Sequence, residues 1–191
     1  MKIRLARELQ IDSIVDGEGI RTVVWTQGCP HHCNGCHNPH TFNYDGGFEA
    51  DTDDIINELS NVQIQDGITF SGGDPMVQAE ACSKIAKAAK ELGFSVWSYT
   101  GYTFEELQEK AKENPNIMEF LQYIDVLIDS RFILEEKSMD IYYRGSKNQR
   151  IIDVPKTLKR NKVILIEKYM KDKPIRRFRY ENLYQEKGVF V

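Results

Sequence analysis

Three of the four cysteines in this chain stand within eight positions, and this cluster constrains the fold and the chemistry more than any other feature. Cys29, Cys33 and Cys36 have the spacing C-x3-C-x2-C and directly follow a largely apolar run at 22–26. Thiolates crowded this closely are usually metal ligands, because soft sulfur suits iron-sulfur clusters and zinc. Three ligands leave one iron of a four-iron cluster open, whereas a structural zinc requires a closed set of four.

A zinc site is the alternative to an iron-sulfur cluster, because histidines near the cysteines could complete its ligand set. All four histidines of the chain, His31, His32, His37 and His40, lie in or beside the cysteine loop. The spacing from Cys36 to His40 suits the end of a Cys3His zinc site. The loop by itself therefore predicts a metal centre and leaves both metals open.

Cys82 stands apart from this loop. It lies in the alanine-rich segment 77–86, which has the composition of a helix. Free cysteine is often a small buried side chain, so we expect no chemistry from Cys82. Free and clustered thiols also fit a reducing compartment.

The composition is that of a globular protein. With 191 residues and 41% hydrophobic content, the chain is long enough for a single domain over 1–191 with its own core. We find no apolar run of about 18 residues and no secretory signal, so we expect a cytoplasmic protein without a membrane partner. The net charge of -4 argues against nucleic acid as a partner.

Apolar segments alternate with helical ones along the chain. We predict strands at about 20–26, 67–70, 94–99 and 125–129, and helices at about 52–59, 77–92 and 104–112, with a short helix before 123. This alternation predicts an α/β fold with a mostly parallel sheet. The cysteine loop and the segment S-G-G-D-P at 71–75 both follow predicted strands, and the carboxyl ends of parallel strands share one edge of a sheet.

The C-terminal extension from 161 to 191 is less defined. Residues 162–167 have the composition of a further strand, and 171–180 is basic, with Arg176, Arg177 and Arg179. A solvated tail is the ordinary interpretation of such a charge run, and a docking surface for an acidic partner is the alternative.

These motifs together resemble the radical S-adenosylmethionine enzymes. Within that superfamily, D-G-E-G-I-R at 16–21, Q-G-C-P at 27–30, C-H-N-P at 36–39 and R-G-S-K-N-Q-R at 144–150 look like the activating proteins of anaerobic ribonucleoside-triphosphate reductases. The resemblance covers about residues 10–153. It implies an incomplete (β/α) barrel with the cysteine loop and the glycine pair at one mouth.

The resemblance also implies the cofactors and their residues. Cys29, Cys33 and Cys36 would hold a 4Fe-4S cluster whose open iron binds S-adenosyl-L-methionine. By the same likeness, further cofactor contacts come from residues beside the third cysteine and in the second motif, namely Gly35, Cys36, His37, Gly72, Gly73 and Asp74. We expect the glycines to let backbone approach the ligand, because a Cβ there would fill its space, and Asp74 to accept from its amino group.

The implied activity is that of an oxidoreductase that generates a glycyl radical. The implied partners are the large subunit of the anaerobic reductase and a low-potential electron donor such as flavodoxin or ferredoxin. Two alternatives stay open: an activase of another glycyl-radical enzyme, of the pyruvate formate-lyase type, and a non-catalytic zinc or electron-transfer module. The roles of Asp125, Asp129, Asn148 and Gln149 also stay open.

Overall fold

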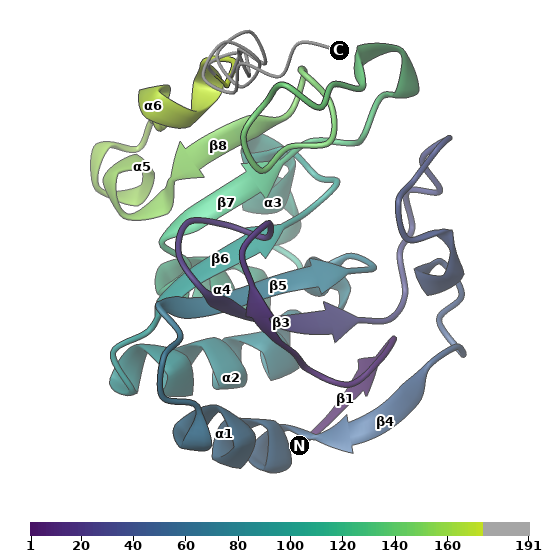
Figure 1. Cartoon of the computed structure of the whole chain (residues 1–191), viewed down its shortest axis with the longest axis vertical. Coiled ribbons are helices and arrows are strands. Elements are labelled where there is room, and N and C mark those ends of the chain that lie inside the picture. Colours follow the sequence, from purple (N-terminus) through teal and green to yellow (C-terminus); the bar gives the residue numbers. More distant parts are fainter. Residues whose placement is uncertain (174–191) are drawn as a thin grey trace, which may run out of the picture.

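The computed structural model describes residues 1–173 and is organised around one eight-stranded sheet (Figure 1). The strands are β1 (Lys2–Leu5), β2 (Gln10–Ser13), β3 (Arg21–Thr26), β4 (Phe48–Asp51), β5 (Gly67–Gly72), β6 (Ser95–Tyr99), β7 (Val126–Asp129) and β8 (Arg150–Asp153). The α-helices are α1 (Thr52–Asn61), α2 (Ala79–Glu91), α3 (Phe104–Lys110), α4 (Asn116–Tyr123), α5 (Val154–Arg160) and α6 (Glu167–Met170). The short 3-10 helices are η1 (Pro39–Thr41), η2 (Pro75–Gln78) and η3 (Leu134–Glu136).

The four central strands run parallel, as the sequence predicts. The strand order is β4-β1-β3-β5-β6-β7-β8, and β2 pairs with β3 outside this path. Strands β3, β5, β6 and β7 pair in parallel, whereas the pairs toward both edges are antiparallel. A parallel return needs a crossover that is usually helical, and the described segment between β7 and β8 holds no α-helix, so β8 comes back antiparallel.

The sheet is open. Strand β4 forms one edge and β8 the other, and no pairing joins them within residues 1–173 (Figure 1). The predicted α/β class is therefore confirmed, while the predicted incomplete barrel is not: the observed architecture is a mixed sheet with a parallel centre.

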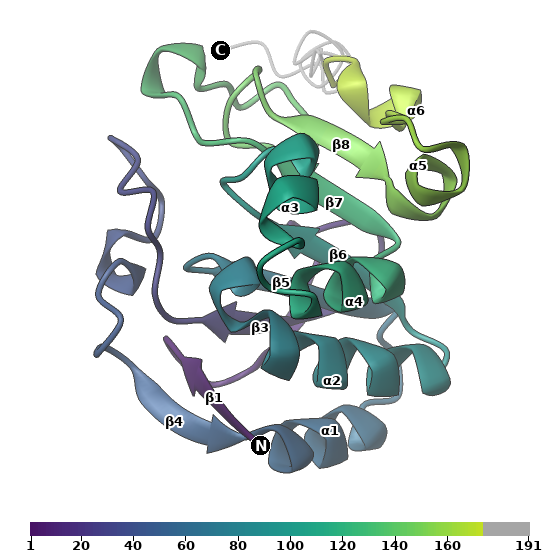
Figure 2. The ribbon, with the colours of Figure 1, turned by 180° about the vertical axis from the view of Figure 1, so that it is seen from behind.

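One face of the sheet is covered by α1, α2, α3 and α4, as Figure 2 shows. Apolar side chains of the strands, such as Phe70 and Leu127, pack there against Ile85 of α2 and Phe120 of α4. The rings of Phe70 and Phe120 meet edge to face at 5.0 Å. Each such side chain contributes about 1.5–3 kcal/mol when fully buried, so this layer is the main hydrophobic core.

Local side-chain caps begin α1 and α3 where the sequence predicts helices to start. The Asp51 carboxylate accepts from the Asp53 amide at the start of α1. Thr103 and Glu106 form a reciprocal capping box at the start of α3. Each cap satisfies amides that the first helical turn leaves without partners, which fixes where the strand-to-helix connections end.

The opposite face of the sheet carries a buried cation, Arg21. Its guanidinium donates to the Thr69 hydroxyl, to Ser95 and to the Glu18 carbonyl, and it lies 5.2 Å from the Trp97 ring. No carboxylate of the described residues forms an ion pair with it, and burial lowers its pKa to about 10. Arg21 thereby holds the turn at 16–19 against the strands through neutral oxygens.

Two parts of the chain differ from the sequence expectations. Residues 162–167 do not form a strand: Leu165 makes one isolated bridge to Ile152, and α6 begins at Glu167. The short strands β1, β2, β4 and β8 were not predicted. Each has only four residues, and β1, β4 and β8 are fixed by pairing with strands distant in sequence. The predicted basic segment lies mostly outside the described residues, since Arg176, Arg177 and Arg179 follow residue 173.

Among residues 1–173, no helix combines the length and the apolarity that a membrane span requires.

Cys82 provides a test of the core. It is fully buried in α2, where burial raises the pKa of its thiol. Cys82→Ala is expected to cost about 1 kcal/mol of unfolding free energy, the value of one small buried group, and to leave metal binding intact. Urea unfolding and iron analysis measure the two effects. Loss of iron with normal stability would contradict the structural role.

Candidate metal and cofactor site

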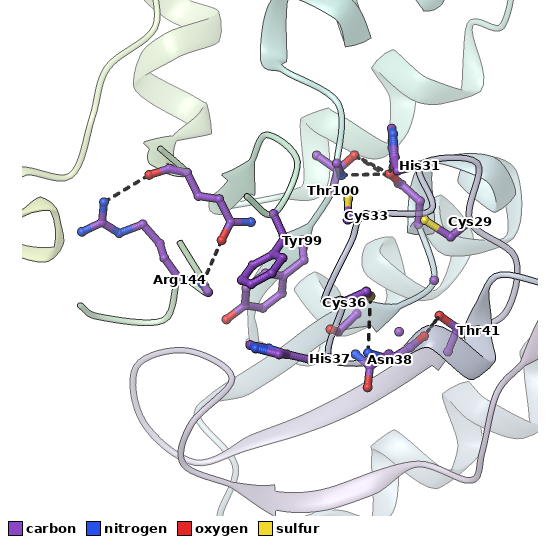
Figure 3. Close-up of a pocket in the computed structure, with 18 of the residues that line it drawn as sticks. Cys29, His31, Cys33, Cys36, His37, Asn38, Thr41, Tyr99, Thr100 and Arg144 are labelled. Carbon is purple, nitrogen blue, oxygen red and sulfur yellow. Dashed lines mark hydrogen bonds and ion pairs between the residues drawn. The ribbon is translucent and has the colours of Figure 1, made fainter. Parts of the chain in front are cut away.

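A cavity of about 470 Å³ opens at the carboxyl ends of the central strands. Its wall includes the three cysteines of the loop, and Figure 3 shows them on one side of Tyr99 with Arg144 on the other. Its remaining polar lining comes from both predicted motifs and from three later loops, and includes His31, His37, Gly72, Gly73, Asp74, Thr100, Ser130 and Gln149. The structure thus brings together the two motifs that the sequence places after separate strands.

Backbone hydrogen bonds hold the cysteine loop at the end of β3. The Gly28 amide donates to the Thr41 carbonyl at 2.9 Å, and the Cys29 amide donates to the Phe42 carbonyl at 3.3 Å. Gly28 has a φ of +94°, and a Cβ there would lie 2.8 Å from the Tyr44 ring. Glycine is therefore required where the chain turns from the strand into the loop.

The glycine pair packs directly on this turn. The Gly73 amide donates to the Thr26 carbonyl at 2.7 Å, and the Asp74 amide donates to the Gly28 carbonyl at 2.8 Å. A Cβ on Gly72 would lie 2.5 Å from the Thr26 oxygen, and one on Gly73 would lie 2.2 Å from the Gly28 oxygen. A side chain at either position would therefore overlap the backbone of the neighbouring strand end, and the close approach of these glycines to a ligand stays a prediction.

The Asp74 side chain is buried among protein donors. Its carboxylate accepts from the Met76 amide, the Gly101 amide and the Thr100 hydroxyl, each at 3.0 Å. The Nε2 atom of His31 lies 2.8 Å from Asp74 Oδ2. These contacts are all to the protein itself, and the expected role of Asp74 as an acceptor for a ligand's amino group stays a prediction.

The three thiols suit a cluster better than a single ion. All three are free, yet within residues 1–173 no three His, Cys, Asp or Glu side chains converge on one ion position. Zinc needs four ligands on one ion, whereas the thiolates of an iron-sulfur cube bind separate irons. His40, the candidate fourth zinc ligand, is exposed and absent from the cavity wall. The donor set therefore favours the cluster.

Comparison with known proteins agrees with this chemistry. The family described as a 4Fe-4S single cluster domain matches residues 15–152. The anaerobic ribonucleoside-triphosphate reductase-activating protein of Haemophilus influenzae is 34% identical over 146 residues, which cover 72% of this chain and 90% of the relative. The proteins of the same name from Escherichia coli K12 and from Enterobacteria phage T4 are 34% and 35% identical, over 90% and 86% of their lengths.

The chain belongs to the family of anaerobic ribonucleoside-triphosphate reductase-activating proteins. The cysteine loop and all cavity-lining residues except Lys173 lie within residues 15–152, which the family model matches. The resemblance that the sequence motifs indicate is therefore confirmed. A 4Fe-4S cluster domain is the part of the cofactor prediction that the family supports.

The residues beside the third cysteine face a later loop of this family member. Gly35 has a φ of +72°, and a Cβ there would lie 2.8 Å from the Leu134 side chain. The His37 ring lies 5.2 Å from the Phe132 ring. Cys36 and His37 line the cavity, whereas Gly35 does not. Their contact with an adenosyl ligand stays a prediction.

All four residues whose roles were left open have structural partners. Asp129 is fully buried, accepts from the Phe104 amide and pairs with Arg150, and Asp125 pairs with Lys90 at 2.8 Å. The Asn148 amide donates to the Arg131 carbonyl at 2.8 Å. Gln149 accepts from the Gly145 amide at 2.8 Å and also lines the cavity.

Several cavity residues were not predicted. Tyr99 ends strand β6 and Thr100 follows it, and the Tyr99 hydroxyl donates to the Tyr143 carbonyl at 2.8 Å. Arg144 is 8% exposed, donates to the carbonyls of Gln149 and Tyr169, and adds a cation to the wall. Tyr99 and Thr100 could have been found from the sequence, because they stand at the carboxyl end of a predicted parallel strand. The position of Arg144 depends on the fold of a long loop, which the sequence pattern does not predict.

Gly73→Ala tests the packing of the two motifs. Its φ is not left-handed, so the added methyl acts only by overlap with Gly28, and we expect a loss of about 3 kcal/mol of stability together with loss of iron. Gly93→Ala is the matched control, because Gly93 has a φ of +87° and no neighbour within 4 Å. It is expected to cost about 1–2 kcal/mol and to retain iron. Equal iron retention in both variants would contradict this assignment.

The pKa values of the thiols predict pH-dependent assembly. Burial raises the pKa of Cys29 to about 11 and also raises that of Cys36. Both thiols are thus protonated near neutral pH, and iron must displace those protons. Below the raised pKa, each pH unit upward should favour metal binding by about tenfold per thiol. Anaerobic iron titrations between about pH 7 and pH 9 measure this, and an affinity that does not change with pH would refute it.

Proposed function

We propose that this protein is a radical S-adenosyl-L-methionine activase of the anaerobic ribonucleoside-triphosphate reductase. Cys29, Cys33 and Cys36 would hold a 4Fe-4S cluster, which supplies the electron that cleaves S-adenosyl-L-methionine into methionine and a 5′-deoxyadenosyl radical. With the cofactor bound, a Cα hydrogen of one reductase glycine would pass to that radical, giving 5′-deoxyadenosine and a glycyl radical on the reductase. The observation that carries the proposal is the three-thiol wall of one strand-end cavity in a chain of this family.

The chain's own residues would position the reactants. A volume of about 470 Å³ lies in the range of small-ligand sites. Gly72, Gly73 and Asp74 would offer mainly backbone atoms to the ligand, and Gly35, Cys36 and His37 would lie near its adenosyl end. Arg144 adds a positive charge to the opposite wall, where it would attract an anionic group of the ligand or of the target peptide.

Two partners follow from this activity. The large reductase subunit must present its glycine at the cavity mouth, because misplacement by about 1 Å costs on the order of a hundredfold in rate. A low-potential donor such as flavodoxin or ferredoxin would reduce the cluster. We also propose that residues 1–191 form a single domain.

Glycyl-radical formation tests the activity. Reduced protein reconstituted with iron and sulfide, mixed with S-adenosyl-L-methionine and the anaerobic reductase, is expected to give a glycyl doublet in electron paramagnetic resonance. Replacing Cys29, Cys33 or Cys36 with alanine should abolish cofactor cleavage, while Cys82→Ala should retain it. A doublet only with pyruvate formate-lyase would reassign the partner. Stoichiometric zinc in the protein purified without oxygen, with no iron uptake on reconstitution, would refute the proposal.

A further inference from the structure

One histidine of the cysteine loop is buried while its neighbour is exposed. The His31 side chain is only 4% exposed, although it stands between Cys29 and Cys33. The next residue, His32, is exposed, and its ring lies 4.7 Å from the Phe42 ring. A polar ring is buried at a cost unless it finds partners, so the partners of His31 are informative.

His31 reaches across the cavity wall to two other segments. Its Nε2 atom lies 2.8 Å from Asp74 Oδ2, and its ring meets the Tyr102 ring edge to face at 4.4 Å. A Cβ on Gly101 would lie 2.3 Å from the His31 ring, so glycine at 101 makes the space that the imidazole fills. Figure 3 shows His31 beside Thr100, which follows strand β6.

The acceptor capacity of Asp74 is fully used by the protein. A carboxylate has about four lone-pair sites, and four groups donate to this one: the Met76 and Gly101 amides, the Thr100 hydroxyl and the His31 ring. Asp74 is 1% exposed. An ammonium group of a ligand would have to displace one of these donors.

We propose that His31 is a positioning residue for the cluster, and that Asp74 serves this histidine rather than the amino group of the cofactor. Together with Thr100 and Gly101 they form the His31 lock, which joins the cysteine loop to the ends of β5 and β6. The inference rests on the proposed function, because it concerns the loop that would hold the cluster.

The lock has a clear physical role. The loop amides at Gly28 and Cys29 fix only its first residues, while Cys33 lies four residues further on. The His31 lock anchors the middle of that span through a buried hydrogen bond, which is stronger than an exposed one. It would therefore hold Cys29 and Cys33 at one spacing before and after the cluster is reduced.

The test compares five single variants and one combined variant after anaerobic reconstitution. His31→Ala and Asp74→Asn each break the lock, and Gly101→Ala expels the imidazole by overlap. His31→Gln keeps an N–H donor at a similar reach and is the conservative rescue. His32→Asn is the matched control in the same loop, because His32 has a φ of 49° that asparagine tolerates. Thermal unfolding of the metal-free proteins identifies any variant that fails to fold.

The first measurement is the lifetime of the cluster against an iron chelator, with its midpoint potential recorded in parallel. His31→Ala, Asp74→Asn and Gly101→Ala are expected to shorten the lifetime about tenfold, the size of one lost buried polar contact. The combined variant of His31→Ala and Asp74→Asn should be no worse than either alone. His31→Gln should recover most of the lifetime, and His32→Asn should match the unmodified protein.

The second measurement is affinity for S-adenosyl-L-methionine, read from the spectrum of the reduced cluster. The lock requires His31→Ala and Asp74→Asn to change this affinity by the same factor. A tenfold or greater weakening in Asp74→Asn alone, with the lifetime and affinity of His31→Ala unchanged, would show that Asp74 binds the ligand and overturn the proposal.

Amide hydrogen exchange of the metal-free protein separates this inference from the proposed function. Exchange in the 29–37 peptide should rise in His31→Ala and Gly101→Ala and stay unchanged in His32→Asn. This readout needs no cluster, so it supports or refutes the lock even if the protein fails to cleave S-adenosyl-L-methionine. Unchanged exchange in both lock variants would overturn it.

Discussion

The arrangement of the site depends on one close backbone contact between the ends of two neighbouring strands. The segment after β5 donates two amide hydrogen bonds to the segment that leaves β3, through Gly73 and Asp74. This approach is possible only because positions 72 and 73 have no side chain. Since the cysteine loop starts at this contact, the positions of the thiols follow from the register of β3 on β5, which pairs Thr26 with Gly72.

The two faces of the sheet differ in character: one carries the main hydrophobic core, and the other carries buried polar side chains. The face under α1, α2, α3 and α4 is apolar and carries the main core. The other face holds Arg21, Trp97 and Tyr99, and the segment 10–20 crosses it (Figure 1). Arg21 can be buried there because neutral oxygens accept its hydrogen bonds. The cavity at the strand ends is lined in part by sulfur, imidazole and hydroxyl groups.

Sequence patterns predicted the parts of the fold that depend on local interactions. The helix starts at 52 and 104 were predicted because capping is set by residues within one turn. The central strands were predicted because each is a short apolar run followed by a turn signal. Strands β1, β2, β4 and β8 were missed, and 162–167 was wrongly predicted as a strand, because such pairings are decided by partners elsewhere along the chain.

The sequence by itself determined the chemistry of this protein: three thiols at fixed spacing, a glycine pair after a strand, and a family that these motifs identify. Only the tertiary structure decided what surrounds them. In the folded chain the Asp74 carboxylate contacts His31 and Thr100, Arg144 lies on the cavity wall, and the sheet is open. Spacing along the chain fixes which residues are near in sequence, whereas partners 26 or 43 residues apart meet only when the strands pair.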